Sequence, residues 1–260
     1  MDKRVKHFVL VHGAGHGAWC WYKVATELRA AGHRVTALDM AASGVHPKRV
    51  DELRSMSDYV QPLMEFMESL PSDDRVVLVG HSAGGVSISV AMERYPNKIN
   101  EAVFVTAIMI GPDLNLHAII QQFPQELEFW MDSQHQFHQG LDKPPTSILS
   151  GPKYLESKLY NLSPPEDLTL ATSLVRPHPL FQDEPKLLKD TALTKENYGS
   201  VRRVFVLIEE DKATKESLQR WMIENNPTDE VRVIPGSDHM VMLSKPKELM
   251  KCLLGLAIAE

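Results

Sequence analysis

The sequence predicts an α/β fold, with a mainly parallel sheet, helices on both faces and an inserted helical cap. Short runs of β-branched and aliphatic residues alternate with helix-length amphipathic segments, which is typical of parallel strands joined by crossover helices. This alternation stops at about residue 112 and returns near residue 203, with proline-rich, mostly helical sequence between. In the first half, Ser82 stands between two glycines at the junction of a strand and a helix.

The chain has 260 residues, of which 43% are hydrophobic and 24% charged, an ordinary globular composition. A core of this size needs neither a disulfide nor a metal to hold it. The net charge of −6 argues against a nucleic-acid-binding face. Cys20 and Cys252 are too few for a disulfide framework, and the charged segment 1–6 leads straight into a strand, without a signal-peptide apolar region. No apolar run could span a bilayer, so we expect no membrane partner. From the charge we expect no nucleic-acid partner, and from the two cysteines a cytoplasmic protein.

The first predicted strand, 7–11, is followed by a glycine-rich loop, HGAGHG, over 12–17. This loop lacks the GxGxxG pattern of a dinucleotide site and the lysine of a P-loop, so a nucleotide site is disfavoured. Glycines allow the backbone to approach a ligand closely and to point an N–H toward it. We expect the N–H of Ala14 to donate to a bound oxyanion, with His12 and His16 shaping the loop.

A helix is predicted over 18–31, where Gly32 ends it, and a strand over 34–38. A second helix is predicted over 57–70, with Ser57 and its neighbour as the N-terminal capping signal. Pro62 is expected to delay the start of this helix or to kink it.

The pentapeptide GHSAG over 80–84 has the pattern of a nucleophile elbow. The stretch 75–79 before it is typical of a buried strand, and the stretch 83–95 after it is typical of a helix. In such an elbow the serine occupies a strained turn, and small residues must lie two positions before and after it to avoid collisions. This context predicts an α/β-hydrolase fold in which Ser82 is the nucleophile and the N–H of Ala83 is the second oxyanion donor.

A strand is predicted over 102–107, and the strand pattern then breaks. We expect helices over 116–122, 125–131 and 164–175, in a segment that closes over the site and excludes water. The predicted division is a core over 1–112 and 191–260, with a helical cap over 113–190.

Beyond the cap we expect strands over 203–208 and 231–234, and helices over 215–224 and 247–259. A serine nucleophile needs a histidine base, and in this architecture the chain order is serine, acid, histidine. His239 alone follows the last core strand, in a loop at its carboxyl end, so we expect it to be the base.

The acid that orients this base should follow the preceding strand, where Glu209, Glu210 and Asp211 compete. Asp211 is the first residue fully past the strand and is preferred, with Glu210 as the fallback. Asp238 is disfavoured because a sequence neighbour cannot readily reach the far nitrogen of the His239 ring.

His135 and His138 are three residues apart and could share a helix face. No third ligand follows at a convincing spacing, so we interpret them as solvated cap residues and expect neither a metal nor a cofactor. His81 is expected to line the elbow.

A set of short motifs runs along the chain: HFVLVHG (7–13), GAW (17–19), WYK (21–23), AAGHRVTALD (30–39), AASG (41–44), GSVRR (199–203), EDK (210–212) and DHM (238–240). Through these motifs the chain resembles the plant methylesterase and hydroxynitrile lyase family of α/β-hydrolases nearly end to end. The resemblance implies a cytosolic esterase that releases methanol from small methyl esters, with the catalytic residues Ser82, Asp211 and His239, and it favours Asp211 over Glu210. The substrates implied are methyl esters of small plant hormones (salicylate, jasmonate, indole-acetate) or of specialised metabolites such as alkaloids.

The family contains two chemistries, and two positions separate them. The lyases resemble this chain but carry threonine where Gly13 stands and lysine where Met240 follows the histidine, so the resemblance favours the esterase. A lyase, or a hormone-binding protein with weak or no catalysis, remains an alternative. Ala83 is smaller than the residue usual in the esterases, which predicts a roomier acyl pocket and a bulkier acid.

The resemblance also implies contacts between the cap and the substrate. The partner is a small-molecule methyl ester, and the sequence is compatible with a homodimer. The residues expected to bind the substrate are Gly13, His81, Trp130, Tyr160 and Met240.

Overall fold

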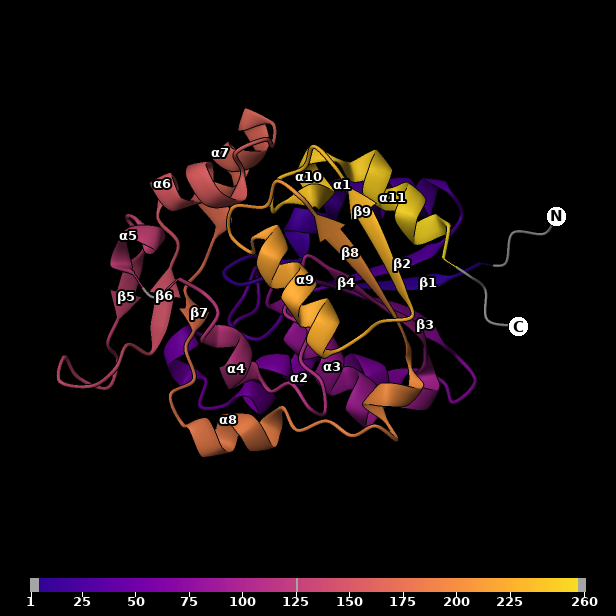
Figure 1. Cartoon of the computed structure of the whole chain (residues 1–260), viewed down its shortest axis with the longest axis horizontal. Coiled ribbons are helices and arrows are strands. Elements are labelled where there is room, and N and C mark those ends of the chain that lie inside the picture. Colours follow the sequence, from indigo (N-terminus) through magenta and orange to yellow (C-terminus); the bar gives the residue numbers. More distant parts are fainter. Residues whose placement is uncertain (1–4, 125, 257–260) are drawn as a thin grey trace.

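The computed structural model describes residues 5–124 and 126–256 (Figure 1). A six-stranded sheet, in which all neighbouring strands are parallel, forms the centre of the molecule. Its strand order is β2-β1-β3-β4-β8-β9, so the strand that leads to Ser82 lies inside the sheet. The strands are β1 His7–Val11, β2 Arg34–Leu38, β3 Val76–His81, β4 Ile99–Val105, β8 Arg202–Ile208 and β9 Glu230–Ile234.

Helices cover both faces of this sheet, as the sequence predicts (Figure 1). Alternate strand residues enter two separate cores: Val9 and Val11 pack with side chains of α2 and α3, whereas Phe8 and Leu10 pack with those of α1 and α11. Strands buried on both faces are therefore almost continuously apolar. The helices of the core are α1 Tyr22–Ala30, α2 Met56–Ser69, α3 Gly84–Arg94, α9 Glu216–Asn225, α10 Val241–Ser244 and α11 Pro246–Leu254, with 3-10 turns at Ala18–Trp21, Val50–Glu52, Pro96–Lys98 and Tyr198–Ser200.

The predicted core strands are all present, with ends displaced by at most three residues. The expected helix over 18–31 divides into a 3-10 turn and α1. Ser55, rather than Ser57, caps α2, because its side chain accepts a 3.1 Å hydrogen bond from the N–H of Asp58. Pro62 lies inside α2 and does not end it. Of the expected helix over 247–259, residues 257–259 lie outside the described residues.

The segment between β4 and β8 contains strands as well as helices, which corrects the expectation of a mostly helical segment without strands. A three-stranded antiparallel sheet joins β5 Gln134–Gln136, β6 Ser147–Leu149 and β7 His178–Pro179, in the order β5-β6-β7. Strands of two or three residues are too short to produce a detectable alternation. The helices are α4 Leu116–Ile120, α5 Leu127–Trp130, α6 Pro152–Tyr154, a π-helical turn at Leu155–Leu159, α7 Pro165–Leu174 and α8 Glu184–Asp190; residue Gln125 of the expected helix over 125–131 lies outside the described residues.

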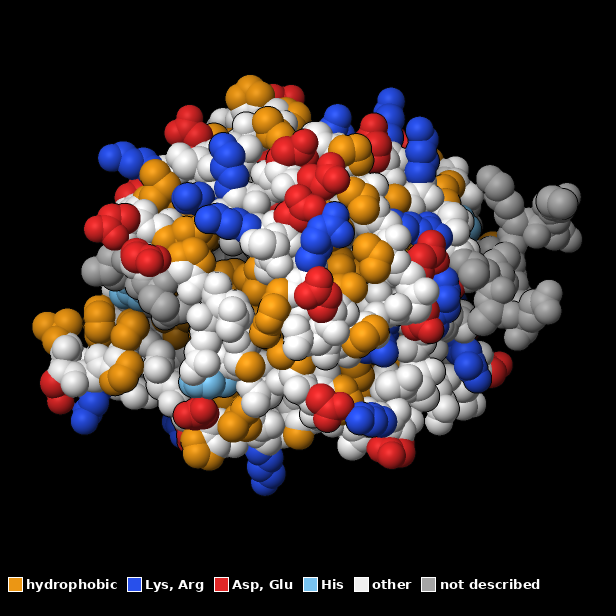
Figure 2. All heavy atoms as spheres, in the orientation of Figure 1, with side chains coloured by type: hydrophobic (Ala, Val, Ile, Leu, Met, Phe, Trp, Pro, Cys, Tyr) orange, Lys and Arg blue, Asp and Glu red, His pale blue; other side chains and the backbone are white. Residues whose placement is uncertain are grey.

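Acidic and basic side chains are intermingled on the face shown in Figure 2, over core and cap alike. Within 5–124 and 126–256, no helix combines the length and the apolar character that crossing a bilayer requires.

Candidate active site

Ser82 occupies a tight turn between β3 and α3. Its φ angle is +52°, a left-handed conformation that is costly for a residue with a side chain, by about 1–3 kcal/mol. The two glycines are required by space: a Cβ on Gly80 would lie 2.9 Å from the carbonyl oxygen of Gly84, and one on Gly84 would lie 2.6 Å from that of His12. Hydrogen bonds from Ser82 N–H to Val105 O (3.3 Å) and from Ile108 N–H to Ser82 O (2.9 Å) hold the turn on β4.

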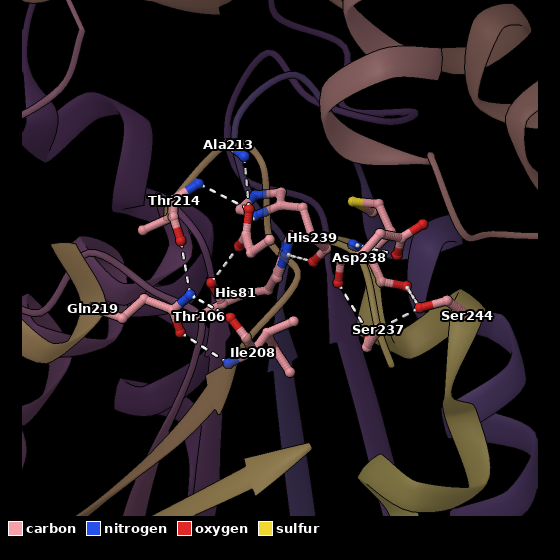
Figure 3. A network of polar contacts seen from close by, with 12 residues as sticks. His81, Thr106, Ile208, Ala213, Thr214, Gln219, Ser237, Asp238, His239 and Ser244 are labelled. Atoms are coloured by element: carbon pink, nitrogen blue, oxygen red, sulfur yellow. Dashed lines mark hydrogen bonds and ion pairs between the residues drawn. The ribbon is translucent and has the colours of Figure 1, made fainter. Parts of the chain in front are cut away.

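His239 and Asp211 form a buried hydrogen-bonded pair beside this turn. His239 Nδ1 donates to Asp211 Oδ2 over 2.6 Å, which leaves the imidazole Nε2 free of its proton in the neutral ring. The other carboxylate oxygen, Oδ1, accepts hydrogen bonds from the N–H groups of Ala213 (2.7 Å) and Thr214 (2.8 Å) (Figure 3). The carboxylate is thus fixed in the orientation that a catalytic acid needs.

Two further residues, which no sequence pattern indicates, support the carboxylate or the loop that carries it. Thr106 Oγ1 donates to Asp211 Oδ2 over 2.6 Å from a strained backbone with φ +38°. The amide of Gln219 bridges Thr214 O (2.7 Å) and both backbone groups of Ile208 (2.9 and 3.0 Å), so the loop that carries Asp211 is tied to the end of β8 (Figure 3).

The competing acids have other partners. Glu210 accepts hydrogen bonds from the N–H groups of Gly236 (2.7 Å) and Ser237 (3.2 Å), and so supports the loop before His239. Asp238 is buried and accepts from Leu162 N–H and Ser163 Oγ, both at 2.8 Å, which fastens the histidine loop to the cap. Asp211 is the acid that contacts the His239 ring.

His81 buttresses His239 from the elbow. Its Nε2 donates to the carbonyl oxygen of His239 over 2.8 Å, and the two ring centroids lie 4.6 Å apart. Burial, with the nearby His239, lowers the pKa of His81 well below the ordinary histidine value, so this ring is neutral.

The glycine-rich loop packs directly against the serine. A Cβ on Gly13 would lie 2.8 Å from Ser82 Cβ, so only glycine fits without displacement. His16 Nδ1 donates to the carbonyl oxygen of Ala14 (2.8 Å), and its Nε2 accepts from the hydroxyl of Tyr160 (2.7 Å). Burial lowers the pKa of His16 to about 4, which keeps the ring neutral and the arrangement of donors fixed.

Ser82, His239, Ala14 and Ala83 all line one cavity of about 440 Å³. Ala83 immediately precedes α3, where unpaired backbone N–H groups and the positive end of the helix dipole favour negative charge. Most of the other lining residues come from the segment 113–190, and apolar side chains outnumber polar ones among them. The full lining is Gly13, Ala14, His16, His81, Ser82, Ala83, Ile108, Ile120, Phe123, Pro124, Trp130, His135, Ile148, Ser150, Tyr154, Leu159, His178, Leu180, Ala213, Thr214 and His239.

Of the five predicted substrate-binding residues, Gly13, His81 and Trp130 line the cavity, whereas Tyr160 and Met240 do not. Tyr160 lies behind the wall, where its ring stacks on His16. Met240 is fully buried in the core on the α1 and α11 face.

His135 lines the cavity, which corrects its interpretation as a solvated residue, while His138 is exposed. His135 lies in β5, so the two do not share a helix face. Across the described part of the chain, no group of three histidine, cysteine, aspartate or glutamate side chains is placed to hold a metal ion.

Known proteins resemble this chain over almost its whole length. A model of the alpha/beta hydrolase family matches residues 8–251. The chain is 60% identical over 250 residues to methyl jasmonate esterase 1 of Vitis vinifera, covering 96% of this chain and 95% of that protein. It is 49% identical over 257 residues to salicylic acid-binding protein 2 of Nicotiana tabacum, covering 98% of each. A crystal structure of a polyneuridine aldehyde esterase mutant superposes with a TM-score of 0.92 at 41% identity, covering 98% of this chain and 100% of that one.

Proposed function

The chain belongs to the alpha/beta hydrolase family, and we propose that it is a serine carboxylesterase that hydrolyses methyl esters of small plant hormones or specialised metabolites. One observation carries the proposal: Ser82 at a strained elbow shares a small, mainly apolar cavity with His239, whose ring is held by Asp211. Relatives named methyl jasmonate esterase and polyneuridine aldehyde esterase support the same class of reaction.

The reaction proceeds through an acyl-enzyme. His239 Nε2 takes the proton of the Ser82 hydroxyl, and Oγ attacks the ester carbonyl. The N–H groups of Ala14 and Ala83 hold the oxyanion, and losing one such donor typically costs about 3 kcal/mol of transition-state stabilisation. Collapse of this intermediate breaks the acyl–oxygen bond, and the departing methoxide takes the proton from His239 to leave as methanol. Water then gives a proton to His239 and attacks the acyl group, which releases the acid and restores Ser82.

Asp211 acts through the histidine. Its carboxylate holds the Nδ1–H tautomer and stabilises the imidazolium that forms at each proton transfer. The two backbone donors at Oδ1 and the hydroxyl of Thr106 at Oδ2 keep the carboxylate from rotating away. We therefore assign Thr106 and Gln219 supporting roles outside the reacting atoms.

The size of the cavity supports an acid bulkier than salicylate. Ala83 leaves space beside the nucleophile, and apolar cap residues such as Ile120, Phe123 and Leu159 surround the rest. A terpenoid or alkaloid acid would bury its apolar surface there.

A hydroxynitrile lyase is the alternative within the family. A threonine at position 13 would place a Cβ 2.8 Å from Ser82 Cβ and 3.0 Å from His81 Nδ1. The backbone at this position therefore accepts glycine but not the threonine of the lyases without displacement. Cyanide release from mandelonitrile discriminates the two activities.

A binding protein with weak catalysis is the other alternative, and a salicylic acid-binding relative gives it a precedent. A fluorophosphonate probe tests it: an activated Ser82 is labelled, and methyl esters that occupy the cavity slow the labelling. If Ser82 is labelled and the methyl esters neither protect it nor are cleaved, the proposed substrate class is wrong. If Ser82 is not labelled, the binding protein is the better description.

We propose residues 113–190 as a cap over a core formed by 1–112 and 191–260, and the cytoplasm as the location. Free thiols at Cys20 and Cys252 support a reducing compartment. Sedimentation velocity determines whether the protein is a homodimer.

A further inference from the structure

The cap sheet presents a row of three side chains to the cavity. In its register, His135 pairs with Ile148, and Ile148 pairs with His178. Residues directly opposite one another on neighbouring strands point to the same face of a sheet. All three residues line the cavity, so this row forms the cap wall.

His178 is held firmly in this wall. Two residues before it, Arg176 N–H donates to Gly15 O in the glycine-rich loop over 2.8 Å. The Arg176 guanidinium donates to three carbonyl oxygens of the loop after β2, those of Gly44 (3.1 Å), His46 (2.8 Å) and Lys48 (2.9 Å). The ring of Tyr59 meets the His178 ring edge-on at 5.4 Å. The imidazole is thus a rigid group of the cavity rather than a mobile surface side chain.

The protonation of His178 defines what it can recognise. Burial, together with His12 and His16, lowers its pKa to about 3, so the ring is neutral at physiological pH. Its Nδ1 is shielded and has no partner among the described residues. Because a buried N–H without an acceptor is costlier than an unpaired lone pair, the proton belongs on Nε2. His178 as a whole is only partly buried, and it lines the cavity.

We propose that His178 determines specificity by donating a hydrogen bond from Nε2–H to an uncharged carbonyl oxygen on the acid part of the ester, away from the ester group. This inference rests on the proposed methylesterase function. Ser82 and His239 line the cavity from the core, whereas His178 lines it from the cap, so the recognised carbonyl belongs to the distal part of the acid. A second carboxylate is excluded from this position, because a neutral ring among Ile148, Phe123 and Leu180 offers no compensating charge. A ketone on the acid part meets this requirement, so a keto methyl ester is the substrate with which we test the inference.

A matched pair of esters tests the inference. Methyl jasmonate is a cyclopentanone with a methyl acetate arm, and its deoxo analogue has CH₂ in place of the ring ketone. We expect His178→Leu to lower kcat/KM for the ketone roughly tenfold, the usual effect of losing one hydrogen bond, and for the deoxo analogue by less than about twofold. His178→Gln, which keeps an N–H donor, should retain part of the preference for the ketone. His138→Leu, at an exposed cap residue outside the cavity, should change neither value.

Each other outcome has a definite meaning. If His178→Leu lowers both values equally, His178 is structural and the inference is overturned. If the wild type cleaves both esters equally well, the inference is overturned while the methylesterase function stands. If the wild type cleaves neither ester of the pair but releases methanol from another methyl ester of the proposed class, the inference is overturned while the methylesterase function stands. If it cleaves no methyl ester although a fluorophosphonate labels Ser82, the proposed function itself is wrong, and the inference falls with it.

Discussion

The hydroxyl of Thr106 lies 2.6 Å from Asp211 Oδ2, the same oxygen that accepts the hydrogen bond of His239. Thr106 is fully buried at the end of β4, and its N–H donates to Val206 O on β8 over 2.9 Å. Thr106, at the end of β4, therefore positions the Asp211 carboxylate, which follows the neighbouring strand β8.

Replacing Thr106 with valine should impair the reaction without preventing folding. The variant keeps the shape of the side chain but removes one of four donors to the Asp211 carboxylate, so we expect kcat to fall roughly tenfold, with KM little changed. Thr106→Ser restores the donor and should stay within about threefold of the wild type. Steady-state kinetics on one methyl ester measure this, and equal losses in the valine and serine variants would contradict a role through the hydroxyl.

The adjacent acids Glu210 and Asp211 provide a matched pair. Asp211→Asn removes the charge that stabilises the His239 imidazolium and should lower kcat about 10⁴-fold, as in comparable triads. Glu210→Gln keeps an acceptor for the N–H groups of Gly236 and Ser237, and should remain within about fivefold of the wild type. Circular dichroism of both variants checks the fold. A larger loss in the Glu210 variant would reverse the assignment of the acid.

Enlarging Ala83 should narrow the acyl pocket. Ala83→Leu places a longer side chain next to the nucleophile, and we expect kcat/KM for a bulky acid such as jasmonate to fall at least tenfold more than for methyl salicylate. The measurement is a competition between the two esters in one reaction. Equal losses on the two esters would show that Ala83 does not set the size of the acid.

The buried histidines predict a loss of stability in acid. The folded-state pKa of His16, about 4, lies below the ordinary value of 6.5, so between these pH values the unfolded chain binds the proton more tightly. The free energy of unfolding should therefore fall as the pH decreases from 6.5 to 4, by up to about 1.4 kcal/mol per pH unit for each such group.

Urea unfolding at pH 7.0, 5.5 and 4.5 measures this dependence. His16→Gln removes the titrating group, and the variant should lose less stability than the wild type over the same interval. An identical slope in the two proteins would show that His16 is not buried as a neutral ring.

The sequence predicts the core, the elbow at Ser82 and the pairing of Asp211 with His239, because all three depend on simple local or topological constraints. Gly80 and Gly84 are required by contacts under 3 Å, and this steric requirement is what the GHSAG pattern expresses. Asp211 and His239 come just after β8 and β9, and in a parallel sheet the carboxyl ends of the strands lie at one edge. The 2.6 Å contact between the two side chains follows from this topology.

The cap could not be predicted to the same extent. Its strands have only two or three residues, which is too short for a periodic pattern. The sequence therefore does not indicate that His135 and His178 face the cavity or that both pair with Ile148. The π-helical turn Leu155–Leu159 departs from the helical period, and Tyr154 rather than Tyr160 lines the cavity. No sequence pattern predicts the roles of Thr106 and Gln219 either, because their contacts to Asp211 and Ile208 depend on tertiary packing.

The central claim, that Ser82 attacks methyl esters, is tested most directly by methanol release. The wild type and Ser82→Ala would be incubated with methyl jasmonate, methyl salicylate, methyl indole-acetate and an alkaloid aldehyde methyl ester, and methanol and the free acid quantified by mass spectrometry. The account predicts methanol and acid in equal amounts from at least one ester with the wild type, and neither above background with a folded Ser82→Ala variant. Substantial hydrolysis by that variant would contradict the mechanism.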